Sequence, residues 1–592
     1  MTQHNQLMKQ KLILLVAALS WAASFTPNLQ AATSTWNNGA ADFTWNLTSA
    51  NWTPGGTWVQ DNDAVFGATG VGTITLGDDI SVSNMTFTVT GYTIQANGKY
   101  STNRVVTANA GTSNALALSM WGPDSLTFQG PGTTILLGDS AVNDANHYTG
   151  GTYIRGGTVI LQAAGTTSSG AAGSSHAIDS VEALDAGATL VIPGAWNGVN
   201  GATSVRDQIA YAPNSRLNMT GGTLDLYNDQ KNQRVPVPEG NGLIINTGPN
   251  IQSGLQALIG STDKTFSGVI TDGNNGVLAT NNNFNNGPGY QIGILQLNNG
   301  ANGSGGVWTL TGSNTYSGST RIDCGNGGIR LAGNGQIGFP SPNGLTGPLR
   351  ILGNSFLDLG GRNQTIALMQ DGAATAQIFN SAVGTVSTLT IGYGNELANR
   401  TCSYQLKDNT GTGGRLALRK INSAPYVHWT GPIMNTCTQT LTATCVATYS
   451  GDTSVEGGYL ILNGPSAVSP SSAYRIYPSN GGTLKLNYAG TANARQLWIN
   501  GVQQPNGVYG AGTPGIDSSS TGTITITGYA PVTLNATTSG SNLNLSWDGV
   551  YKLQIKTSIM GAWSDYSGGG ESPVSVPLDK TAGSVFFRLI NY

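Results

Sequence analysis

Short stretches of alternating apolar and polar residues recur along most of the chain. They read GTITL at 72–76, GTTILLG at 132–138, TYIRGGTVILQ at 152–162, GTLDLY at 222–227, GTLKLNY at 482–488 and GTITITG at 522–528. This period-two alternation is typical of β-strands with one buried face. Gly and Asn separate the stretches and supply the positive φ angles of tight turns. Runs with helical spacing are nearly absent after residue 31, so the pattern predicts an all-β protein.

One strand–turn–strand pattern occurs several times. Residues 148–161 read YTGGTYIRGGTVIL and residues 449–462 read YSGDTSVEGGYLIL, so the frame Y-[ST]-G-x-T-x-[IV]-x-G-G-x-[VL]-I-L holds through fourteen positions. A third copy begins at Tyr316 with two extra residues before its Gly-Gly pair, and a degenerate fourth begins at Phe266. We expect the Tyr, Thr and branched apolar positions to point inward, with Gly-Gly at a corner. Such units bury their apolar sides by stacking on one another, whereas independent β-hairpins are the alternative.

This frame resembles the autotransporter-associated β-strand repeat of large exported bacterial proteins. Further segments are similar to the start, the linking strands and the closing element of that family: 35–37 (TWN), 43–45 (FTW), 51–54 (NWTP), 63–67 (DAVFG), 355–366 (SFLDLGGRNQTI) and 497–510 (LWINGVQQPNGVYG). The resemblance covers roughly residues 33–528. It implies a right-handed parallel β-helix, with a capping region and first coils at 32–105 and the main solenoid at 106–528.

The last part of the chain departs from that family. An autotransporter ends in a translocating barrel of amphipathic strands, and the residues after Tyr529 are too few for one. Segments such as 551–555 (YKLQI) and 585–589 (VFFRL) resemble a small antiparallel β-sandwich common on exported proteins of Verrucomicrobia and Planctomycetes. We therefore expect residues 529–592 to form such a module and expect the chain not to secrete itself. Its aromatic residues are expected in the core, with a sugar platform as the alternative.

The N-terminus has the three parts of a secretory signal peptide. Lys9 and Lys11 precede an apolar run of about 14 residues, shorter than the roughly 20 of a membrane span, and small residues follow at Ala31-Ala32. We predict a signal peptide over 1–31 and no membrane span in the mature chain, with an uncleaved anchor as the alternative. The expected location is the extracellular space or the cell surface of a Gram-negative-type bacterium.

Composition narrows the function classes. Charged residues make up only 9% of the chain and the net charge is -3, while Gly contributes 84 of 592 residues; an ordinary soluble protein has about 25% charged residues. The 12 Trp, 21 Tyr and 12 Phe favour ordered β structure over disorder. No basic cluster indicates a nucleic-acid partner.

The four cysteines do not form a scaffold. Export permits disulfides, and Cys437 and Cys445 are close enough in sequence to bridge a local loop. With Cys324 and Cys402, three pairings are open, and the sequence does not choose among them. No C-x-x-C spacing indicates zinc. We predict no metal and no cofactor.

Candidate catalytic residues are scattered. The mature chain has His147, His176 and His428, without metal-ligand spacing and without a G-x-S-x-G nucleophile motif. Polysaccharide hydrolases and lyases with a β-helix fold need clustered carboxylates, often beside a basic residue. The candidate carboxylate groups are Asp225 and Asp229 with Lys231 and Arg234, and Arg321 with Asp323; a calcium site is conceivable at Asp61, Asn62, Asp63, Asp78 and Asp79. Solvated faces are the expected role of all these groups, so we assign no catalytic, cofactor-binding or metal-binding residue.

We therefore expect a secreted or surface-displayed structural or adhesive β-solenoid rather than an enzyme. Its expected partners are extracellular polymers, glycans or cell-surface components, through weak repeated contacts, and self-association is a further expectation. A polysaccharide hydrolase or lyase on the same scaffold is one alternative. A carbohydrate-binding protein that uses exposed Trp or Tyr in its terminal modules is the other.

Overall fold

The structure is a computed structural model that carries side chains, and it divides into two compact units, residues 1–253 and 254–592. It describes residues 31–592 except 139–146, 149, 164–176, 179, 194–207, 211–214, 228–232, 249–252, 274–291, 300–304, 339–346, 394–398, 410–412, 423–436, 529–532, 548–550, 568–571, 578–582 and 592. The predicted signal peptide over 1–31 lies outside these residues except for Ala31. The boundaries predicted at 105 and 528 stay predictions.

The described residues confirm the all-β prediction. Strands follow one another throughout, and the regular helices among the described residues are the short 3-10 turns η2 (Pro465–Ala467) and η3 (Pro478–Asn480). Most strand pairs are parallel, and each of the six alternating stretches that predicted strands overlaps at least one strand. Parallel neighbours arise because consecutive layers repeat the same alternation at similar spacing, so equivalent residues meet in register.

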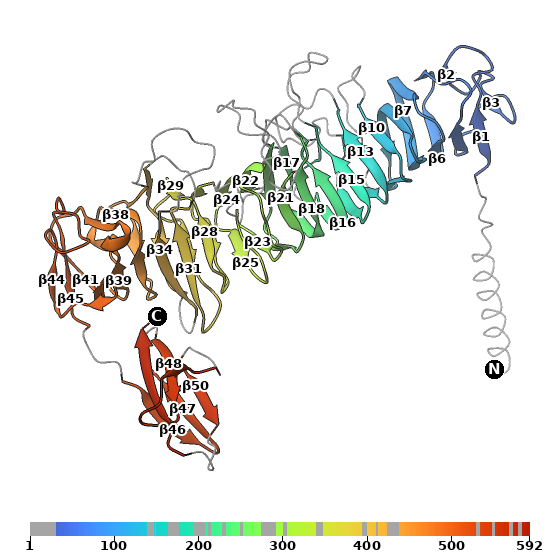
Figure 1. The fold of residues 1–592 in the computed structure, drawn as a ribbon. Helices are drawn as coiled ribbons and strands as arrows, with labels where there is room; N and C mark the ends of the chain where they lie inside the picture. Colours follow the sequence, from blue (N-terminus) through green and yellow to red (C-terminus); the bar gives the residue numbers. More distant parts are fainter. Residues whose placement is uncertain are drawn as a thin grey trace, which may run out of the picture. The chain divides into compact units, whose positions relative to one another are not determined.

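In the first unit, two continuous parallel ladders run from layer to layer (Figure 1). The first contains β1 (Thr33–Trp36), β4 (Asp63–Phe66), β6 (Ile80–Phe87), β7 (Thr93–Ala108), β9 (Leu126–Gln129), β12 (Thr152–Ile154), β14 (Val181–Asp185), β16 (Leu217–Asp225) and β18 (Pro238–Asn246). The second contains β2 (Thr44–Trp45), β5 (Thr73–Leu76), β7, β8 (Ser113–Gly122), β10 (Thr133–Leu136), β13 (Gly157–Leu161), β15 (Ala188–Val191) and β16. The remaining strands are β3 (Trp52–Thr53), β11 (His147–Tyr148) and β17 (Gln233–Pro236).

Buried aromatic rings fill the beginning of the first unit. The Trp52 ring centroid lies 5.3 Å from that of Trp36, 4.9 Å from that of Trp45 and 4.6 Å from that of Trp58. Phe66 packs against the same rings at 5.8 Å from Trp52, and all five side chains are buried. Trp36, Trp45, Trp52 and Phe66 of the quoted segments therefore form one local core together with Trp58, whereas Phe43 is exposed.

In the second unit, three parallel ladders matter for the candidate sites. The Phe356 ladder contains β20 (Lys264–Phe266), β23 (Val307–Leu310), β25 (Gly328–Leu331), β27 (Phe356–Asp358), β30 (Gln377–Phe379), β33 (Gln405–Leu406) and β36 (Val446–Ala447). The Trp498 ladder contains β28 (Gln364–Ile366), β31 (Val386–Ile391), β34 (Arg415–Lys420), β37 (Thr453–Val455), β39 (Ala473–Ile476) and β42 (Gln496–Ile499), which turns back into β43 (Val502–Gln503). The Tyr459 ladder contains β32 (Arg400–Cys402), β35 (Thr438–Leu441), β38 (Gly458–Leu462) and β40 (Gly482–Leu486).

The second unit also contains strands outside these three ladders. A further parallel ladder contains β22 (Ile292–Asn299), β24 (Ser319–Asp323), β26 (Leu349–Ile351) and β29 (Met369–Gln370). The remaining strands before residue 529 are β19 (Ser253–Ile259), β21 (Val269–Asp272), β41 (Thr491–Ala494), β44 (Gly507–Tyr509) and β45 (Thr523–Ile526).

Register places like residues on like residues in the core. In the Phe356 ladder, the inward column contains Trp308, Ile329, Leu357, Ile378, Leu406 and Ala447, each buried and each paired with the next. Buried amides join layers as well. Asn314 Oδ1 accepts from the backbone N–H of Ile270 at 2.9 Å, and its Nδ2 donates to the carbonyl of Gln336 at 2.8 Å. Apolar columns and bridging amides thus hold the layers together with few charges.

The C-terminal strands pair antiparallel. One sheet contains β46 (Asn535–Ser539), β47 (Asn542–Ser546) and β50 (Val574–Pro577), and the other contains β48 (Tyr551–Lys556), β49 (Ser564–Asp565) and β51 (Phe586–Asn591). They share a small core of Leu545, Trp547, Leu553, Val574 and Val576. Trp547 is buried in this core, as predicted, whereas Tyr551, Tyr566 and Phe587 are half-buried and pack against it.

Candidate functional site

Asp225, of the first predicted carboxylate group, binds backbone and hydroxyl donors. Its carboxylate accepts from the backbone N–H of Tyr227 at 3.1 Å and from the N–H and hydroxyl of Thr247 at 3.0 and 2.5 Å. Asp225 is buried at the end of β16 and stabilises the neighbouring turn. Asp229 and Lys231 lie outside the described residues, and Arg234 lies on β17.

The second predicted group, Arg321 and Asp323, is a simple ion pair. Both residues lie on β24 two positions apart, and their side chains meet at 3.0 Å between Nη2 and Oδ2. A single carboxylate held by a neighbouring guanidinium lacks the second acid that glycoside hydrolysis requires.

The acidic residues near the N-terminus bind different partners. The Asp63 carboxylate accepts from the Asn84 side chain at 2.7 Å, Asp78 from the N–H of Leu47 at 3.0 Å, and Asp79 from the N–H of Tyr100 at 3.0 Å. Asp61 accepts from the hydroxyl of Ser81, and the Asn62 amide donates to Ser34 at 3.1 Å. Within the described residues, no group of three or more His, Cys, Asp or Glu side chains is arranged to hold a metal ion.

The structure locates one of the three histidines and all four cysteines. His176 and His428 lie outside the described residues, and His147 begins β11. Cys324, Cys402, Cys437 and Cys445 are buried as thiols, so none of the three pairings that the sequence left open is formed. Burial raises the pKa of the Cys324 and Cys445 thiols to about 12, which keeps both protonated and weakly reactive.

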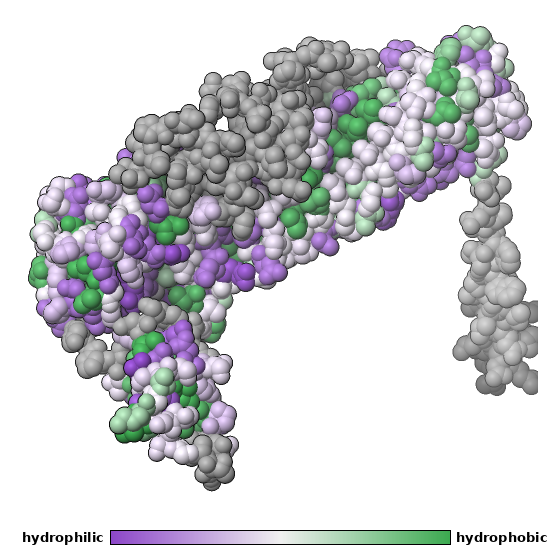
Figure 2. Space-filling view, in the orientation of Figure 1, coloured by the Kyte–Doolittle hydropathy of each residue, from purple (hydrophilic) through white to green (hydrophobic). Residues whose placement is uncertain are grey.

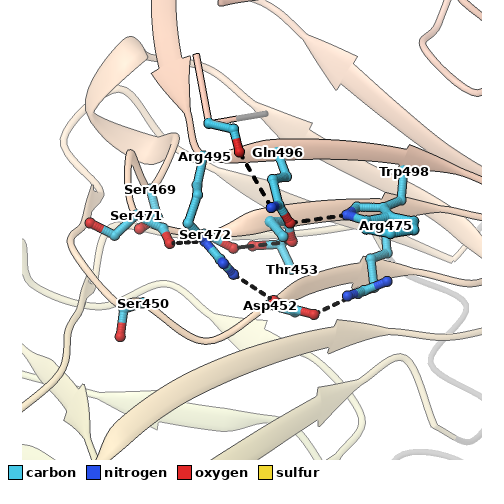
Figure 3. Close-up of polar contacts among 12 residues, drawn as sticks. Ser450, Asp452, Thr453, Ser469, Ser471, Ser472, Arg475, Arg495, Gln496 and Trp498 are labelled. Carbon is cyan, nitrogen blue, oxygen red and sulfur yellow. Dashed lines mark hydrogen bonds and ion pairs between the residues drawn. The ribbon is translucent and has the colours of Figure 1, made fainter. Parts of the chain in front are cut away.

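A carboxylate between two guanidinium groups lies outside the sequence candidates. Asp452 precedes β37 and accepts from Arg475 Nε at 2.5 Å and from Arg495 Nη2 at 3.2 Å (Figure 3). The Arg475 guanidinium also stacks over the Trp498 ring, 4.7 Å from its centroid, and Trp498 Nε1 donates to Gln496 Oε1 at 3.2 Å. Arg475 and Trp498 are register partners on β39 and β42.

The Asp452 cluster is mostly sealed from solvent. Only 18% of the Asp452 side chain and 11% of the Arg475 side chain are exposed. Arg495 Nε additionally donates to the Ser471 carbonyl at 3.0 Å, so this guanidinium is held from two sides. One carboxylate shared by two guanidinium groups leaves the cluster with a net charge of +1. The cluster ties three consecutive layers together, and its one carboxylate is already held by both arginines.

A shallow, open groove lies on the outer face of the Phe356 ladder. It has a volume of about 500 Å³, within the roughly 300–1,000 Å³ range of small-molecule sites. Its lining is Asn326, Asn354, Phe356, Thr375, Gln377, Phe379 and Gln405. None of these side chains is charged, so the groove is an aromatic and amide surface.

Glycine 328 positions one wall of the groove. Gly328 and Phe356 are register partners, and a Cβ on Gly328 would overlap the carbonyl oxygen of Phe356 and lie 2.6 Å from its ring Cδ2. The Phe356 ring therefore occupies the space that a side chain at 328 would take. Phe379 on the next strand completes the aromatic wall, with the two ring centroids 5.4 Å apart and the planes tilted by 46°.

Sequence reasoning missed both Asp452 and the groove. Phe356 and Phe379 carried a detectable signal, because each puts an aromatic residue at an outward position of the strand alternation, flanking the inward Leu357 and Ile378. Asp452 stands at the variable position of the repeat frame. Nothing in the sequence marked the two arginines as its partners, since they follow it by 23 and 43 residues.

Comparisons with protein-family models, with curated proteins and with solved structures gave no match to this chain. Among the described residues, no helix has the length and hydropathy needed to cross a membrane.

Proposed function

We propose that this chain is an exported structural or adhesive protein built as a right-handed parallel β-helix and followed by a small C-terminal β-sandwich. On this proposal it resembles the autotransporter-associated repeat proteins and is released from or displayed on a Gram-negative-type bacterium. The observation that carries the proposal is the register: residues such as Ile329, Leu357 and Ile378 stack in one buried column through successive parallel layers.

The stacked layers suit a mechanical and adhesive role. Each layer buries its apolar column against two neighbours, so the assembly holds without a large charge complement. In Figure 2 the described surface is mostly pale, as expected from its Gly, Ser and Thr content, with small separate hydrophobic patches. Such a surface supports weak polar contacts that gain strength through repetition along a polymer.

An enzyme on the same scaffold is the alternative. The contacts of the described carboxylates favour it less than they favour a structural role. Asp225 serves backbone N–H groups, Asp323 pairs with Arg321, and Asp452 is shared by two guanidinium groups. A glycosidase needs two carboxyl groups about 5–10 Å apart across an open substrate site. We therefore propose a role without turnover.

The proposal is tested by fractionating cells that produce the full chain and sequencing the N-terminus of the mature protein. We expect the protein outside the inner membrane, beginning near Ala32. The purified protein is then incubated with a panel of plant and bacterial polysaccharides. New reducing ends or unsaturated sugar products from any polymer would contradict a structural role, and retention in the cytoplasm would contradict export.

A further inference from the structure

The groove on the Phe356 ladder has the chemistry of a carbohydrate site. We propose that it binds a segment of an uncharged polysaccharide, with pyranose rings against Phe356 and Phe379 and sugar hydroxyls on the surrounding amides. This proposal rests on the proposed function and names the class of extracellular polymer that the protein contacts.

The aromatic wall supplies the apolar contact. Phe356 and Phe379 are half-buried, so part of each ring faces the groove, and their centroids lie 5.4 Å apart. The rings are fixed: Phe356 packs on the bare backbone of Gly328, and the Lys407 ammonium lies 5.8 Å from the centroid of Phe379. A rigid ring that carries no polar atom favours the C–H faces of a sugar, because binding loses little conformational freedom.

The amides supply donors and acceptors together. Asn354 Nδ2 donates to Asn326 Oδ1 at 3.1 Å, which leaves the Asn354 oxygen and the Asn326 amide group for a ligand. Gln405 Nε2 donates to the Ala374 carbonyl at 3.1 Å, which leaves its oxygen. The Gln377 side chain has no hydrogen-bond partner among the described residues, and it lines the groove as the register partner of Phe356, two positions before Phe379 on β30. Sugar hydroxyls both donate and accept, and amides match them in both senses.

Charge distinguishes this ligand from others that stack on aromatic rings. Single-stranded nucleic acid needs a positively charged groove, and acidic sugars or phosphates need Arg or Lys for their anions. The seven lining residues include neither, and the cation beside them, the Lys407 ammonium, lies over the Phe379 ring at 5.8 Å from its centroid. The nearest ion pair, Arg330 with Asp358, is closed at 2.8 Å, and the Asp358 carboxylate also accepts from the N–H groups of Gly360 and Ser381. The site therefore favours a neutral glycan.

The groove also runs along the stacking direction of the strands, which suits an extended polymer. Its lining residues come from β27, β30 and β33 and from the turns before β25, β27 and β30, so it runs across successive parallel strands. Three strand spacings of about 4.8 Å give roughly 14 Å along the stacking direction. This length accommodates an oligosaccharide segment rather than a single sugar, and the open face lets the polymer continue beyond it.

Affinity electrophoresis and titration calorimetry of the purified full chain test the proposal. The probes are galactomannan, xyloglucan, xylan and mixed-linkage β-glucan, with alginate and polygalacturonate as acidic comparators. We compare the wild type with Phe379→Ala, with Gln377→Ala and with Tyr459→Ala, a control at a half-buried aromatic position of the Tyr459 ladder. Circular dichroism and thermal melting verify the fold of each variant. Gln377→Ala removes no packed ring, so it keeps the test decisive if Phe379→Ala fails to fold.

We expect at least one neutral polymer to bind. The affinity should fall roughly tenfold or more in Phe379→Ala and about fivefold in Gln377→Ala, and should be unchanged in Tyr459→Ala. Binding of acidic polymers alone, binding of no polymer, or equal binding by all variants would overturn the proposal. Equal binding by all variants would leave the adhesive role standing at another surface. Release of sugar products by the wild type would instead refute the structural role while leaving the ligand class intact.

Discussion

The hydroxyl of Tyr316 lies 2.7 Å from Oγ1 of Thr320, and the same contact joins Tyr449 to Thr453 at 2.7 Å. The hydroxyls of Tyr148 and Thr152 are hydrogen-bonded as well. These pairs are the first and fifth positions of the repeat frame, and all six residues are buried. A buried phenol needs a polar partner, so the Y-x-x-x-T spacing places one beside it.

Tyr316→Phe should therefore destabilise the protein more than Tyr449→Phe. The Thr320 hydroxyl has no other hydrogen bond among the described residues, whereas Thr453 keeps a bond with Ser472 at 2.8 Å. We expect a loss of about 2 kcal/mol in unfolding free energy for Tyr316→Phe and about 1 kcal/mol for Tyr449→Phe. Denaturant unfolding of the two variants measures this difference. Equal losses, or a larger loss in Tyr449→Phe, would show that the tyrosine–threonine bond is not the stabilising feature of the frame.

The Asp452 cluster predicts that the free energy of unfolding depends strongly on one carboxylate. Asp452→Ala leaves the Arg475 and Arg495 guanidinium groups without their shared anion in a mostly buried setting, so we expect a loss of about 2 kcal/mol. The matched control is Asp124→Ala, which removes the partner of Arg104 in a pair whose side chains are 60% and 47% exposed. The control should change the unfolding free energy by less than about 0.5 kcal/mol. Similar losses in both variants would contradict the structural role of the cluster.

The buried carboxyl of Asp272 predicts that the stability of the folded protein depends on pH. Burial raises the pKa of this carboxyl from 3.8 to about 6, although hydrogen bonds from Ser317 and from the N–H of Ile292 favour its charged form. The folded chain then binds more protons than the unfolded chain between about pH 4 and 6. Stability therefore falls as the pH rises through this window, by an amount on the order of 3 kcal/mol for the shift.

The comparison is the melting temperature of the wild type and of Asp272→Asn from pH 4 to pH 7. The melting temperature of Asp272→Asn should not show the fall that Asp272 causes in the wild type between pH 4 and 6. The melting-temperature curves of the two proteins should therefore converge or cross toward pH 7. Asp124→Asn, at an exposed position, should keep the wild-type slope. Parallel curves for the wild type and Asp272→Asn would refute this assignment.

The close contacts around Gly328 predict that position 328 tolerates no side chain. The added Cβ of Gly328→Ala would collide with the backbone of Phe356, so the strand or the ring must move at a cost of about 1–3 kcal/mol. Gly260→Ala is the control, since a Cβ there meets nothing within 4 Å. Thermal melting should separate the two variants, and Gly328→Ala should also weaken binding of the neutral polymer. Unchanged stability of Gly328→Ala would show that the Phe356 ring does not depend on this glycine.

Much of the local structure was predictable from the sequence. Alternation located the strands, and the repeat frame correctly placed Tyr316, Thr320 and Ile322 in the interior. Local patterns do this well because strand parity depends only on neighbouring residues. The same parity left Phe356 and Phe379 on the outer face, although only their positions in adjacent strands show that the two rings meet.

The candidate sites were not predictable because they depend on register between layers. The layers differ in length, so the sequence does not show that Asp452 meets Arg475 and Arg495 rather than a nearer cation. Cys437 and Cys445 show that residues close in sequence need not pair in the fold. They are close in sequence, yet both are buried thiols in a chain whose neighbours in space come from other layers.

The most direct measurement is co-sedimentation of the full chain with neutral polysaccharide, with the soluble sugars of the same samples assayed for new ends. A structural protein that contacts extracellular polymer should pellet with at least one neutral polysaccharide and release no reducing ends or unsaturated sugars. Sugar release, or failure to pellet with any polymer in the panel, would contradict that role.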